Sequence, residues 1–426
     1  MKIAYITLGC KVNQYETQAM ERLLSAAGHE TSAPKEADAI IVNTCAVTGE
    51  SARKSRQTLR RMKKNNPSAR LVVCGCFSQA DAPAALECGA DYVGGAGERN
   101  AVVDYLNEIS EAMKMPPDPL SRRTFEELPA GAADGHARAL LKIQDGCSNF
   151  CSYCIIPYLR GRPRSLSVES ACASVKNLAR DGFGEIVITG IEISSYGVDI
   201  GSDLFSLAEA VGAAAEPARI RLGSLEPSVM TDAAVSRLAK IPNLCPHFHL
   251  SLQSGSAGVL MRMRRKYTPA EYLAAAERLR NAFCDPAITT DLIVGFPGET
   301  EAEFLESLTF IEAAGFAAVH IFPYSRRIGT RAADMPGHIA NAEKERRVRL
   351  ASEAAAKTRA AYLHRQTGKS LRVLFETSDG ENNTGHSENY LEVTVSGGEN
   401  PRGKTLPVKI TGVFSDGLVG EVQHDN

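Results

Sequence analysis

Eight residues near the middle of the chain contain three cysteines in the spacing C-x3-C-x2-C: Cys147, Cys151 and Cys154. They follow a short apolar run, 139–143, and an Asp-Gly pair at 145–146. Cysteine thiolates bind iron–sulfur clusters, and three in one loop can ligate three irons of a four-iron cluster. The fourth iron would then lack a protein ligand and could bind a small molecule. A zinc site is the alternative, but zinc sites usually add a second cysteine pair downstream, and none follows here.

This spacing resembles the signature of the radical S-adenosylmethionine (SAM) superfamily. The resemblance implies that Cys147, Cys151 and Cys154 hold a [4Fe–4S] cluster whose open iron chelates SAM. It further implies that an electron from this cluster cleaves SAM to a 5′-deoxyadenosyl radical. The motif therefore indicates a type of chemistry and leaves the substrate open.

Composition sets the class of protein. A length of 426 residues predicts about three domains, and 44% hydrophobic with 23% charged residues is ordinary for a soluble globular protein. The net charge of −2 gives no overall basic field, and eleven cysteines, mostly in apolar surroundings, argue against a secreted disulfide framework. Residues 1–8 are too short for a signal peptide, and no apolar run approaches the ~20 residues that span a membrane. We expect a cytoplasmic protein with neither membrane nor DNA among its partners.

Residues 1–108 alternate short apolar runs with amphipathic stretches, which predicts βαβ units on a parallel sheet. The expected strands are 3–8, 39–43, 71–74 and 92–93, and the expected helices are 14–27, 52–65, 83–87 and 100–110. No G-x-G-x-x-G follows the first strand, so a dinucleotide-binding domain is disfavoured.

Cysteines follow three of these four strands: Cys10, Cys45, and Cys74 with Cys76. Ligands of open α/β sheets bind outside the carboxyl ends of the strands, so these cysteines should converge on one edge. Burial in the core is the common alternative for cysteine, but repetition at equivalent positions favours a site. Cys74 and Cys76 compete for the third place and, two apart in a strand pattern, should point to the same side. We choose Cys76, which lies past the strand end and repeats the Gly-Cys of residues 9–10.

Three N-terminal segments resemble the methylthiotransferase family: T-L-G-C-K-V-N-Q at 7–14, N-T-C-A-V-T at 43–48 and G-C-F-S-Q at 75–79. The resemblance implies a second [4Fe–4S] cluster at Cys10, Cys45 and Cys76 that supplies or carries the sulfur of a methylthio group. Residues 10–13, and 47–48 followed by the basic run 53–56, most resemble the branch that acts on N6-threonylcarbamoyladenosine in tRNA.

Residues 113–137 are rich in Pro and Gly, which predicts a linker with a domain boundary near 130. Strand patterns follow at 139–143, 185–189, 220–225, 247–252, 288–294 and 319–324, alternating with helical patterns at 168–180, 204–215, 232–240, 270–283 and 301–314. Six βα units are too few to close an eight-stranded barrel. They fit the open partial (βα)6 barrel that the superfamily resemblance implies, with the three-cysteine loop at its catalytic face.

Residues at strand ends that match the family are candidates for binding SAM: Gly190, Glu226, Ser251, Gln253 and Arg265. Gly190 would let the backbone approach the cofactor closely, and Glu226 could accept hydrogen bonds from a ribose or an ammonium group. Ser251 and Gln253 share one face of their strand, and Arg265 is the candidate for the SAM carboxylate. The run after Gly190 departs from the family, because a glycine-containing sequence is expected where Glu192 stands.

The C-terminal part begins with a long Pro-free and Gly-free helical pattern at 341–366, which Gly368 ends. Strand patterns at 371–375, 390–395, 405–410 and 418–422 then predict a small β-barrel. It resembles the TRAM domain, an RNA-binding module. From His364 onward the chain has six basic and nine acidic residues, a net charge of −3. A phosphate-binding surface should be basic, so an RNA-binding role for this part rests on the resemblance alone.

Basic clusters lie elsewhere, at 53–64, at Arg160, Arg162 and Arg164, at 262–266, and at Arg326, Arg327 and Arg331. A charge run is usually a solvated face. Three of the four follow cysteine or strand-end motifs, so we expect them to surround the catalytic face and bind a tRNA backbone. RNA enzymes commonly read a base that is flipped out of a loop.

The sequence thus predicts an α/β protein in three parts: a parallel-sheet cluster domain at 1–125, a radical SAM partial barrel at 133–365 and a TRAM-like β-barrel at 366–426. The resemblance implies insertion of a methylthio group at C2 of N6-threonylcarbamoyladenosine at tRNA position 37, next to the anticodon. Two [4Fe–4S] clusters, two SAM molecules and an electron donor such as flavodoxin or ferredoxin would take part.

Three alternatives remain open at this stage. Related enzymes act on isopentenyladenosine in tRNA or on an aspartate of a ribosomal protein. The acidic tail is the one feature that favours a protein substrate. From a different class, the chain could be a non-catalytic iron–sulfur protein that binds RNA or carries electrons, which the intact SAM-binding loop disfavours.

Overall fold

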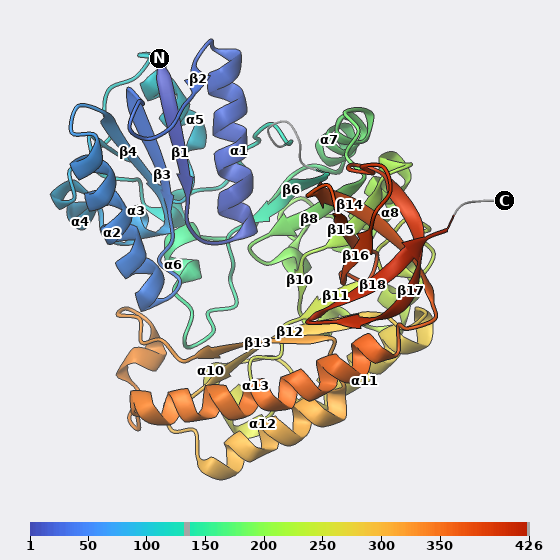
Figure 1. Cartoon of the computed structure of the whole chain (residues 1–426). Helices are drawn as coiled ribbons and strands as arrows, with labels where there is room; N and C mark the ends of the chain where they lie inside the picture. The colour runs from blue at the N-terminus through green and yellow to red at the C-terminus, as the bar shows by residue number, and fades with distance from the viewer. Residues whose placement is uncertain (132–136, 424–426) are drawn as a thin grey trace.

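The computed structural model describes residues 1–131 and 137–423. Figure 1 shows a parallel α/β sheet, an open barrel and a small closed β-barrel following one another along the chain, with a long helix beneath the open barrel. Among the described residues, no helix is long and apolar enough to cross a membrane. The predicted fold class is confirmed.

The N-terminal sheet contains five parallel strands in the order β2-β1-β3-β4-β5. They are β1 (Lys2–Thr7), β2 (Glu30–Thr31), β3 (Ala39–Thr44), β4 (Arg70–Gly75) and β5 (Tyr92–Val93). The helices are α1 (Lys11–Ala26), α2 (Gly49–Asn65), α3 (Cys76–Ala80), α4 (Ala82–Glu87) and α5 (Arg99–Leu106). Alternate residues of β3 pack on opposite faces, Ile40 and Val42 with α2 and Ala39 and Ile41 with α1 and α5. Only β2 and α3 were not predicted, because both are too short to show a period.

The open barrel contains all six predicted strands, β6 (Arg138–Asp145), β8 (Glu185–Gly190), β9 (Arg219–Leu222) with β10 (Ser224–Leu225), β11 (His247–Leu250), β12 (Ala287–Val294) and β13 (Ala318–Pro323). The third expected strand divides at Gly223. A short antiparallel β7 (Arg164–Ser165) pairs with β6. The five predicted helices form as α7 (Val168–Arg180), α8 (Leu204–Ala215), α9 (Asp232–Leu238), α11 (Pro269–Ala282) and α12 (Glu301–Ala314). The short helices α6 (Ile156–Arg160) and α10 (Ala257–Met263) were not predicted.

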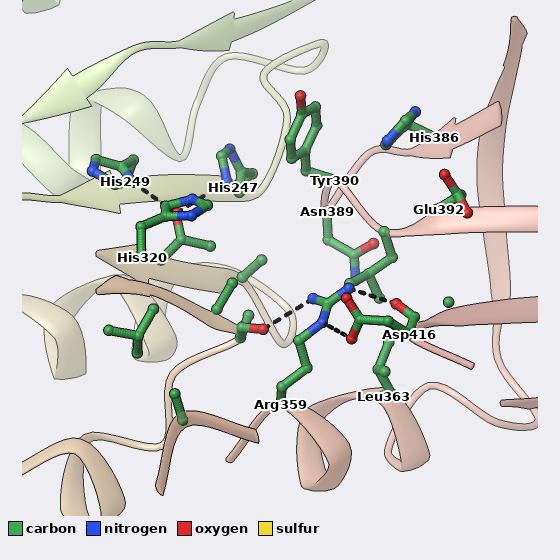
Figure 2. Close-up of a pocket in the computed structure, with 18 of the residues that line it drawn as sticks. His247, His249, His320, Arg359, Leu363, His386, Asn389, Tyr390, Glu392 and Asp416 are labelled. Atoms are coloured by element: carbon green, nitrogen blue, oxygen red, sulfur yellow. Dashed lines mark hydrogen bonds and ion pairs between the residues drawn. The ribbon is translucent and has the colours of Figure 1, made fainter. Parts of the chain in front are cut away.

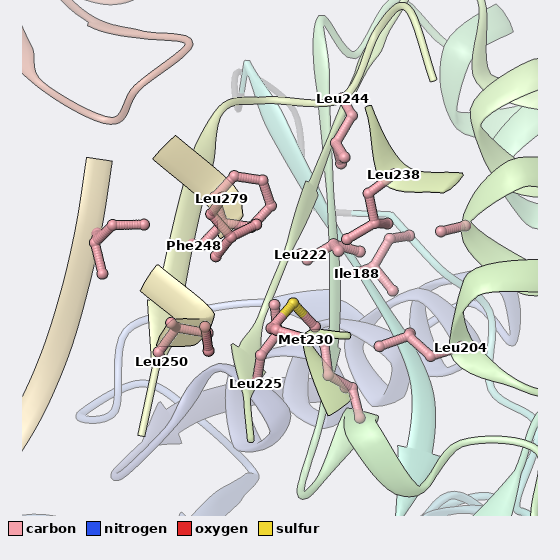
Figure 3. Packing of buried hydrophobic residues seen from close by; sticks show 14 of the residues in the cluster. Ile188, Leu204, Leu222, Leu225, Met230, Leu238, Leu244, Phe248, Leu250 and Leu279 are labelled. Atoms are coloured by element: carbon pink, nitrogen blue, oxygen red, sulfur yellow. The ribbon is translucent and has the colours of Figure 1, made fainter. Parts of the chain in front are cut away.

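The main core lies between the barrel strands and the helices outside them. Figure 3 shows part of it, in which side chains such as Ile188, Leu222 and Phe248 pack against Leu204 and Leu279 from the helices. Full burial of each such side chain contributes about 1.5–3 kcal/mol. Because the apolar residues face the helices, polar residues on the same strands face the barrel interior.

Helix α13 (Asn341–His364) runs along the open barrel and leads into the C-terminal strands. The strands β14 (Ser370–Ser378), β15 (Asn382–Ser387), β16 (Glu392–Ser396), β17 (Thr405–Phe414) and β18 (Gly417–Val422) close a barrel in the order β14-β15-β16-β18-β17. Tyr362 and Leu363 of α13 pack into its core. The strand β15 was not predicted, because its sequence N-N-T-G-H-S has the composition of a turn.

The predicted linker at 113–137 is ordered where the structure describes it. Arg122 donates hydrogen bonds to Glu98 at 2.5 and 3.0 Å and to the Leu159 carbonyl, and the Leu128 carbonyl accepts one from Tyr15. Through these contacts of Arg122 and Leu128, the described part of the linker packs against both the sheet domain and the barrel. Residues 132–136 of the predicted linker lie outside the described part of the chain.

Candidate functional site

The three-cysteine loop lies at the carboxyl end of β6, as the sequence predicted. Gly146 turns the chain there at φ +77°, and a Cβ at this position would lie 2.0 Å from the Arg162 carbonyl oxygen. The Cys147 N–H donates to the Gly161 carbonyl at 3.0 Å. Ser152 anchors the loop to the end of α10, because its N–H donates to the Met263 carbonyl and its hydroxyl to the Arg262 carbonyl at 2.8 Å.

The thiols of this loop lie together in a largely buried position. Burial raises the pKa of Cys147 and of Cys154 to about 12, and the neighbouring thiols of the loop add to both shifts. Cys147 and Cys154 are therefore held in the thiol form until a metal binds, and metal binding would release their protons. Three cysteines close together in one loop fit a [4Fe–4S] cluster in which three irons have a cysteine ligand and the fourth is open.

A small pocket of about 170 Å³ adjoins this loop, lined by Cys151 together with Glu226 and Arg265. One Arg265 nitrogen donates to both Glu226 oxygens, at 2.5 and 2.6 Å, and the other terminal nitrogen donates to the Cys151 sulfur at 3.2 Å. The two side chains are only 5% and 12% exposed. A buried guanidinium beside a carboxylate presents complementary charges to the carboxylate and ammonium groups of an amino acid.

A second carboxyl group, Glu192, lines the same pocket. Burial raises the pKa of Glu192 to about 8, and the neighbouring Glu226 carboxylate adds to the shift. Glu192 accepts hydrogen bonds from the Asn149 amide at 3.4 Å and from the Ser194 N–H at 3.2 Å. Glu192 stands where the family resemblance leads us to expect a glycine-containing sequence, and this difference therefore lies directly in the pocket.

The other predicted SAM-binding residues are more dispersed. Gly190 and Ser224 line a larger cavity inside the barrel, and Ser251 exchanges a hydrogen bond with Ser224 at 3.0 Å. Gln253 has φ +68° and continues the β11 side of the sheet by pairing with Leu292. The small pocket thus gathers Glu226 and Arg265 alone of the five candidates.

The N-terminal cysteines converge at the edge where β1, β3 and β4 end. Gly9 lies against Cys45, since a Cβ at Gly9 would be 2.9 Å from the Cys45 Cβ and 3.2 Å from its sulfur. Burial raises the pKa of Cys76 to about 11, and the Cys10 and Cys45 thiols add to the shift. The three thiols therefore form a second compact set suited to a second cluster.

Cys74 points elsewhere. The chain turns at Gly75 with φ +104°, so Cys76 begins helix α3 rather than continuing β4. The Cys74 side chain packs with Ile3 and Val72 on the opposite face of the sheet. The expectation that the two cysteines point to one side is wrong, because it assumed that the strand continued past Gly75.

A buried network of charges joins the two cysteine sites. Glu16 of α1 accepts hydrogen bonds from Arg99 at 2.6 Å and from Lys142 and Arg160 at 2.8 Å. Lys142 and Arg160 also pair with Asp145, which lies two residues before Cys147. Arg160 reaches the side chain of Asn13 at 2.9 Å, and Asn13 in turn ties the ends of β1 and β3 together.

The prediction that Arg160 and Arg164 belong to a basic surface is wrong. Arg160 is fully buried, and Arg164 is only 3% exposed. Arg262 and Arg265 of another predicted cluster are also paired with carboxylates. The exposed basic residues of α2, including Arg60, remain available to a partner.

A cavity of about 1230 Å³ occupies the barrel interior and is lined by all three parts of the chain. Cys10 and Lys11 line it from the N-terminal sheet domain. Figure 2 shows His247, His249 and His320 on one side and His386, Tyr390 and Glu392 of the C-terminal barrel on the other. Sequence reasoning missed this wall, although the alternation of His247 and His249 on one strand was a visible signal.

Two family models match the chain. Residues 141–311 match the radical SAM superfamily, and residues 2–93 match an uncharacterized protein family, UPF0004. Of the solved structures, the radical SAM methyltransferase TsrM from Kitasatospora setae, with cobalamin and a [4Fe–4S] cluster bound, covers 78% of this chain and 77% of its own at a TM-score of 0.59 and 14% identity. The open barrel and its cysteine loop define a radical SAM enzyme, with a [4Fe–4S] cluster and SAM as cofactors.

Curated relatives narrow this class. The threonylcarbamoyladenosine tRNA methylthiotransferase MtaB of Bacillus subtilis is 38% identical over 96% of this chain and 93% of its own. The MtaB of Thermotoga maritima is 37% identical over 87% and 85%. The tRNA-2-methylthio-N(6)-dimethylallyladenosine synthase of Staphylococcus haemolyticus is 34% identical over 95% and 81%. The chain belongs to the radical SAM methylthiotransferase family, whose members transfer sulfur-containing groups.

Proposed function

We propose that this enzyme inserts a methylthio group at C2 of N6-threonylcarbamoyladenosine at position 37 of tRNA. It would use two SAM molecules and two [4Fe–4S] clusters, held by Cys147, Cys151 and Cys154 and by Cys10, Cys45 and Cys76. An electron donor such as flavodoxin or ferredoxin would supply the reductant. The proposed domains are the cluster domain at 1–125, the radical SAM domain at 133–365 and the TRAM-like domain at 366–426. The TRAM-like domain would assist tRNA binding.

The observation that carries the proposal is a cavity that Cys10 of one cysteine set lines and that lies next to the pocket lined by Cys151 of the other set. Cys10 lines the cavity whose other walls are the interior of the radical SAM barrel and the C-terminal barrel. Gly190 and Ser224 also line this cavity, and Glu192 and Glu226, each two residues further along the chain, line the pocket of Cys151, so a base in the cavity would lie near both sites. C2 of an adenine is unreactive toward acids and bases, and SAM bound at the reduced cluster would supply the radical chemistry that activates it.

The protein's own residues provide binding and positioning. Glu226 and Arg265 would hold the ammonium and carboxylate groups of SAM, in the pocket that they share with Cys151. The buried charges around Glu16 would keep the two cysteine sites in a fixed relation, because each charge is paired within the fold. The barrel wall would shield the reacting carbon from water.

The polar lining favours the threonylcarbamoyl base over the isopentenyl base. Lys11, His247 and His386 line the cavity and can face an anion or a hydroxyl group. The threonylcarbamoyl group carries a carboxylate and a hydroxyl, whereas the isopentenyl group is a hydrocarbon. Burying a hydrocarbon against these polar groups would leave some of them unpaired, which costs free energy.

Mass spectrometry of tRNA nucleosides from a deletion strain tests the substrate. We expect the methylthio form of N6-threonylcarbamoyladenosine to disappear and to return with the wild-type gene, but not with a Cys151→Ala variant. Loss of the methylthio form of isopentenyladenosine instead would overturn this choice. Unchanged tRNA, with loss of a modified aspartate in a ribosomal protein, would move the substrate to a protein.

A further inference from the structure

Three side chains that the radical site does not use gather on the inner face of the barrel. They are His249 of β11, Asp291 of β12 and His320 of β13. The parallel strands place them side by side, since Asp291 pairs in register with His320, and His249 pairs with Thr289 two residues before Asp291. One ligand atom from each lies within 4.8 Å of the other two.

These side chains have few other partners. His249 Nε2 lies 3.5 Å from an Asp291 oxygen, which is the sole ion pair of that carboxylate across residues 1–131 and 137–423. The His320 side chain, which is exposed, makes no hydrogen bond in this described part of the chain, and its ring lies 6.1 Å from the His249 ring. The Asp291 side chain is 32% exposed and that of His249 is 17% exposed. A partly buried carboxylate beside two imidazoles, with no Lys or Arg paired to it among the described residues, is a favourable position for a cation.

We propose that His249, Asp291 and His320 bind a divalent transition-metal ion that is separate from the two iron–sulfur clusters. Two imidazoles and one carboxylate form the ligand set of one class of catalytic zinc sites and of the facial triad that binds non-haem iron. Imidazole nitrogens favour such metals over Mg²⁺ and Ca²⁺, which take oxygen ligands. The remaining coordination positions would face the cavity.

The geometry is close to that of a bound state. Ligands held at about 2.0–2.2 Å from one ion can lie no more than about 4.4 Å apart, so small side-chain rotations would complete the site. His249 Nδ1 already contacts the Thr289 hydroxyl at 3.1 Å. This contact orients the ring and leaves Nε2 toward Asp291, as outer partners of metal-binding histidines commonly do.

Zinc binding to the cluster-loaded protein tests the site, with Zn²⁺ as the probe metal. Protein loaded with iron and sulfide is passed over a chelating resin without oxygen and dialysed against Zn²⁺ at several concentrations. Zinc, iron and sulfide are then measured by elemental and chemical analysis. We expect one Zn²⁺ per wild-type chain with iron and sulfide unchanged, and its loss in the variants His320→Ala and Asp291→Asn.

Two further variants sharpen the result. Thr289→Val should weaken zinc binding by about 10- to 100-fold, because it removes an outer partner of a ligand. His386→Gln is the matched control, since His386 lines the same cavity from the C-terminal barrel and should leave zinc binding unchanged. Zinc held at incompletely loaded cysteine sites would persist in His320→Ala. Equal zinc in wild type and His320→Ala, or none in wild type, would overturn the proposal. Neither outcome depends on which tRNA base is modified.

Discussion

Among single residues, Arg265 is the most informative about SAM binding, because it contacts both a cysteine of the three-cysteine loop and an acidic side chain. Its guanidinium reaches the Cys151 sulfur and both oxygens of Glu226. In the proposed SAM complex this ion pair would open, so that Arg265 would face the carboxylate of SAM and Glu226 its ammonium group. The pair would thereby recognise the amino-acid end of SAM.

Replacing Arg265 tests this assignment. Arg265→Ala should weaken SAM binding by about 10- to 150-fold, since a hydrogen bond to a charged group contributes about 1.5–3 kcal/mol. Equilibrium dialysis with labelled SAM on the cluster-loaded protein measures the change. The control Arg278→Ala removes an arginine paired with an exposed aspartate and should bind SAM as the wild type does. Unchanged affinity in Arg265→Ala would remove this residue from the SAM site.

The choice of Cys76 over Cys74 is a second prediction at this scale. We expect Cys74→Ala to retain two clusters, and Cys76→Ala to retain one, because the Cys76 thiol alone of the two lies beside Cys10 and Cys45. Iron and sulfide assays after anaerobic reconstitution distinguish the variants. The opposite pattern would transfer the ligand to Cys74.

Among the helices, α2 is the best candidate for contact with RNA. Its N-terminus lies beside the barrel edge, where the Gly49 N–H donates to the Ser325 hydroxyl at 2.9 Å. Arg60, Arg61 and Lys64 are exposed along it. This helix gives an exposed basic surface beside the barrel edge at Ser325, which the acidic C-terminal part does not.

The triple variant Arg60→Ala, Arg61→Ala, Lys64→Ala should bind tRNA more weakly and with less dependence on salt. Each phosphate contact contributes about 0.7–0.9 to the slope of log K against log salt, so losing three contacts should reduce the slope by about 2–3. Filter binding or anisotropy over a range of salt concentrations measures it. Arg349→Ala with Lys357→Ala, which removes exposed charges on α13, is the control. The same slope in the triple variant would place the RNA on another face.

At the scale of the whole molecule, one buried carboxylate connects the barrel to the C-terminal domain. Glu185 accepts from Arg219 and Arg221 at 2.6 to 2.7 Å, and these arginines donate onward to backbone carbonyls of residues 372, 386 and 388. Burial would raise the pKa of Glu185, but Arg221 and Arg219 outweigh it and hold this pKa well below its usual range. The contact therefore contributes stability only while Glu185 is ionised.

Glu185→Gln should lower the free energy of unfolding by about 3–5 kcal/mol at neutral pH, because it leaves two buried arginines without their carboxylate. Since the folded pKa is depressed, the wild-type advantage is complete above the unfolded value, about 4.3, and declines as the pH falls below it. Urea unfolding at pH 7 and near pH 4 measures both effects. Glu209→Gln, which breaks an exposed pair with Arg237, should cost about 1 kcal/mol or less. A pH-independent difference for Glu185→Gln would contradict this account.

Local patterns predicted most of the elements. The boundaries of α7, α8 and α12 agree with their predicted ranges, because each helix combines a capping residue with a regular apolar period. The polar strand β15 gave no such signal. Arg160 was wrongly assigned to a surface, since a sequence shows that a residue is charged but not whether another segment covers it.

The sequence by itself determined the chemistry, because C-x3-C-x2-C is a local spacing that one loop can satisfy, and the strand-end cysteines repeat with the βα units. It also determined the class of fold through hydrophobic periods. Only the tertiary structure decided that Cys76 rather than Cys74 faces Cys10, that Glu226 meets Arg265, and that His249, Asp291 and His320 share one wall. These contacts join residues 29 to 71 positions apart, and their distances depend on strand order, register and the turn at Gly75.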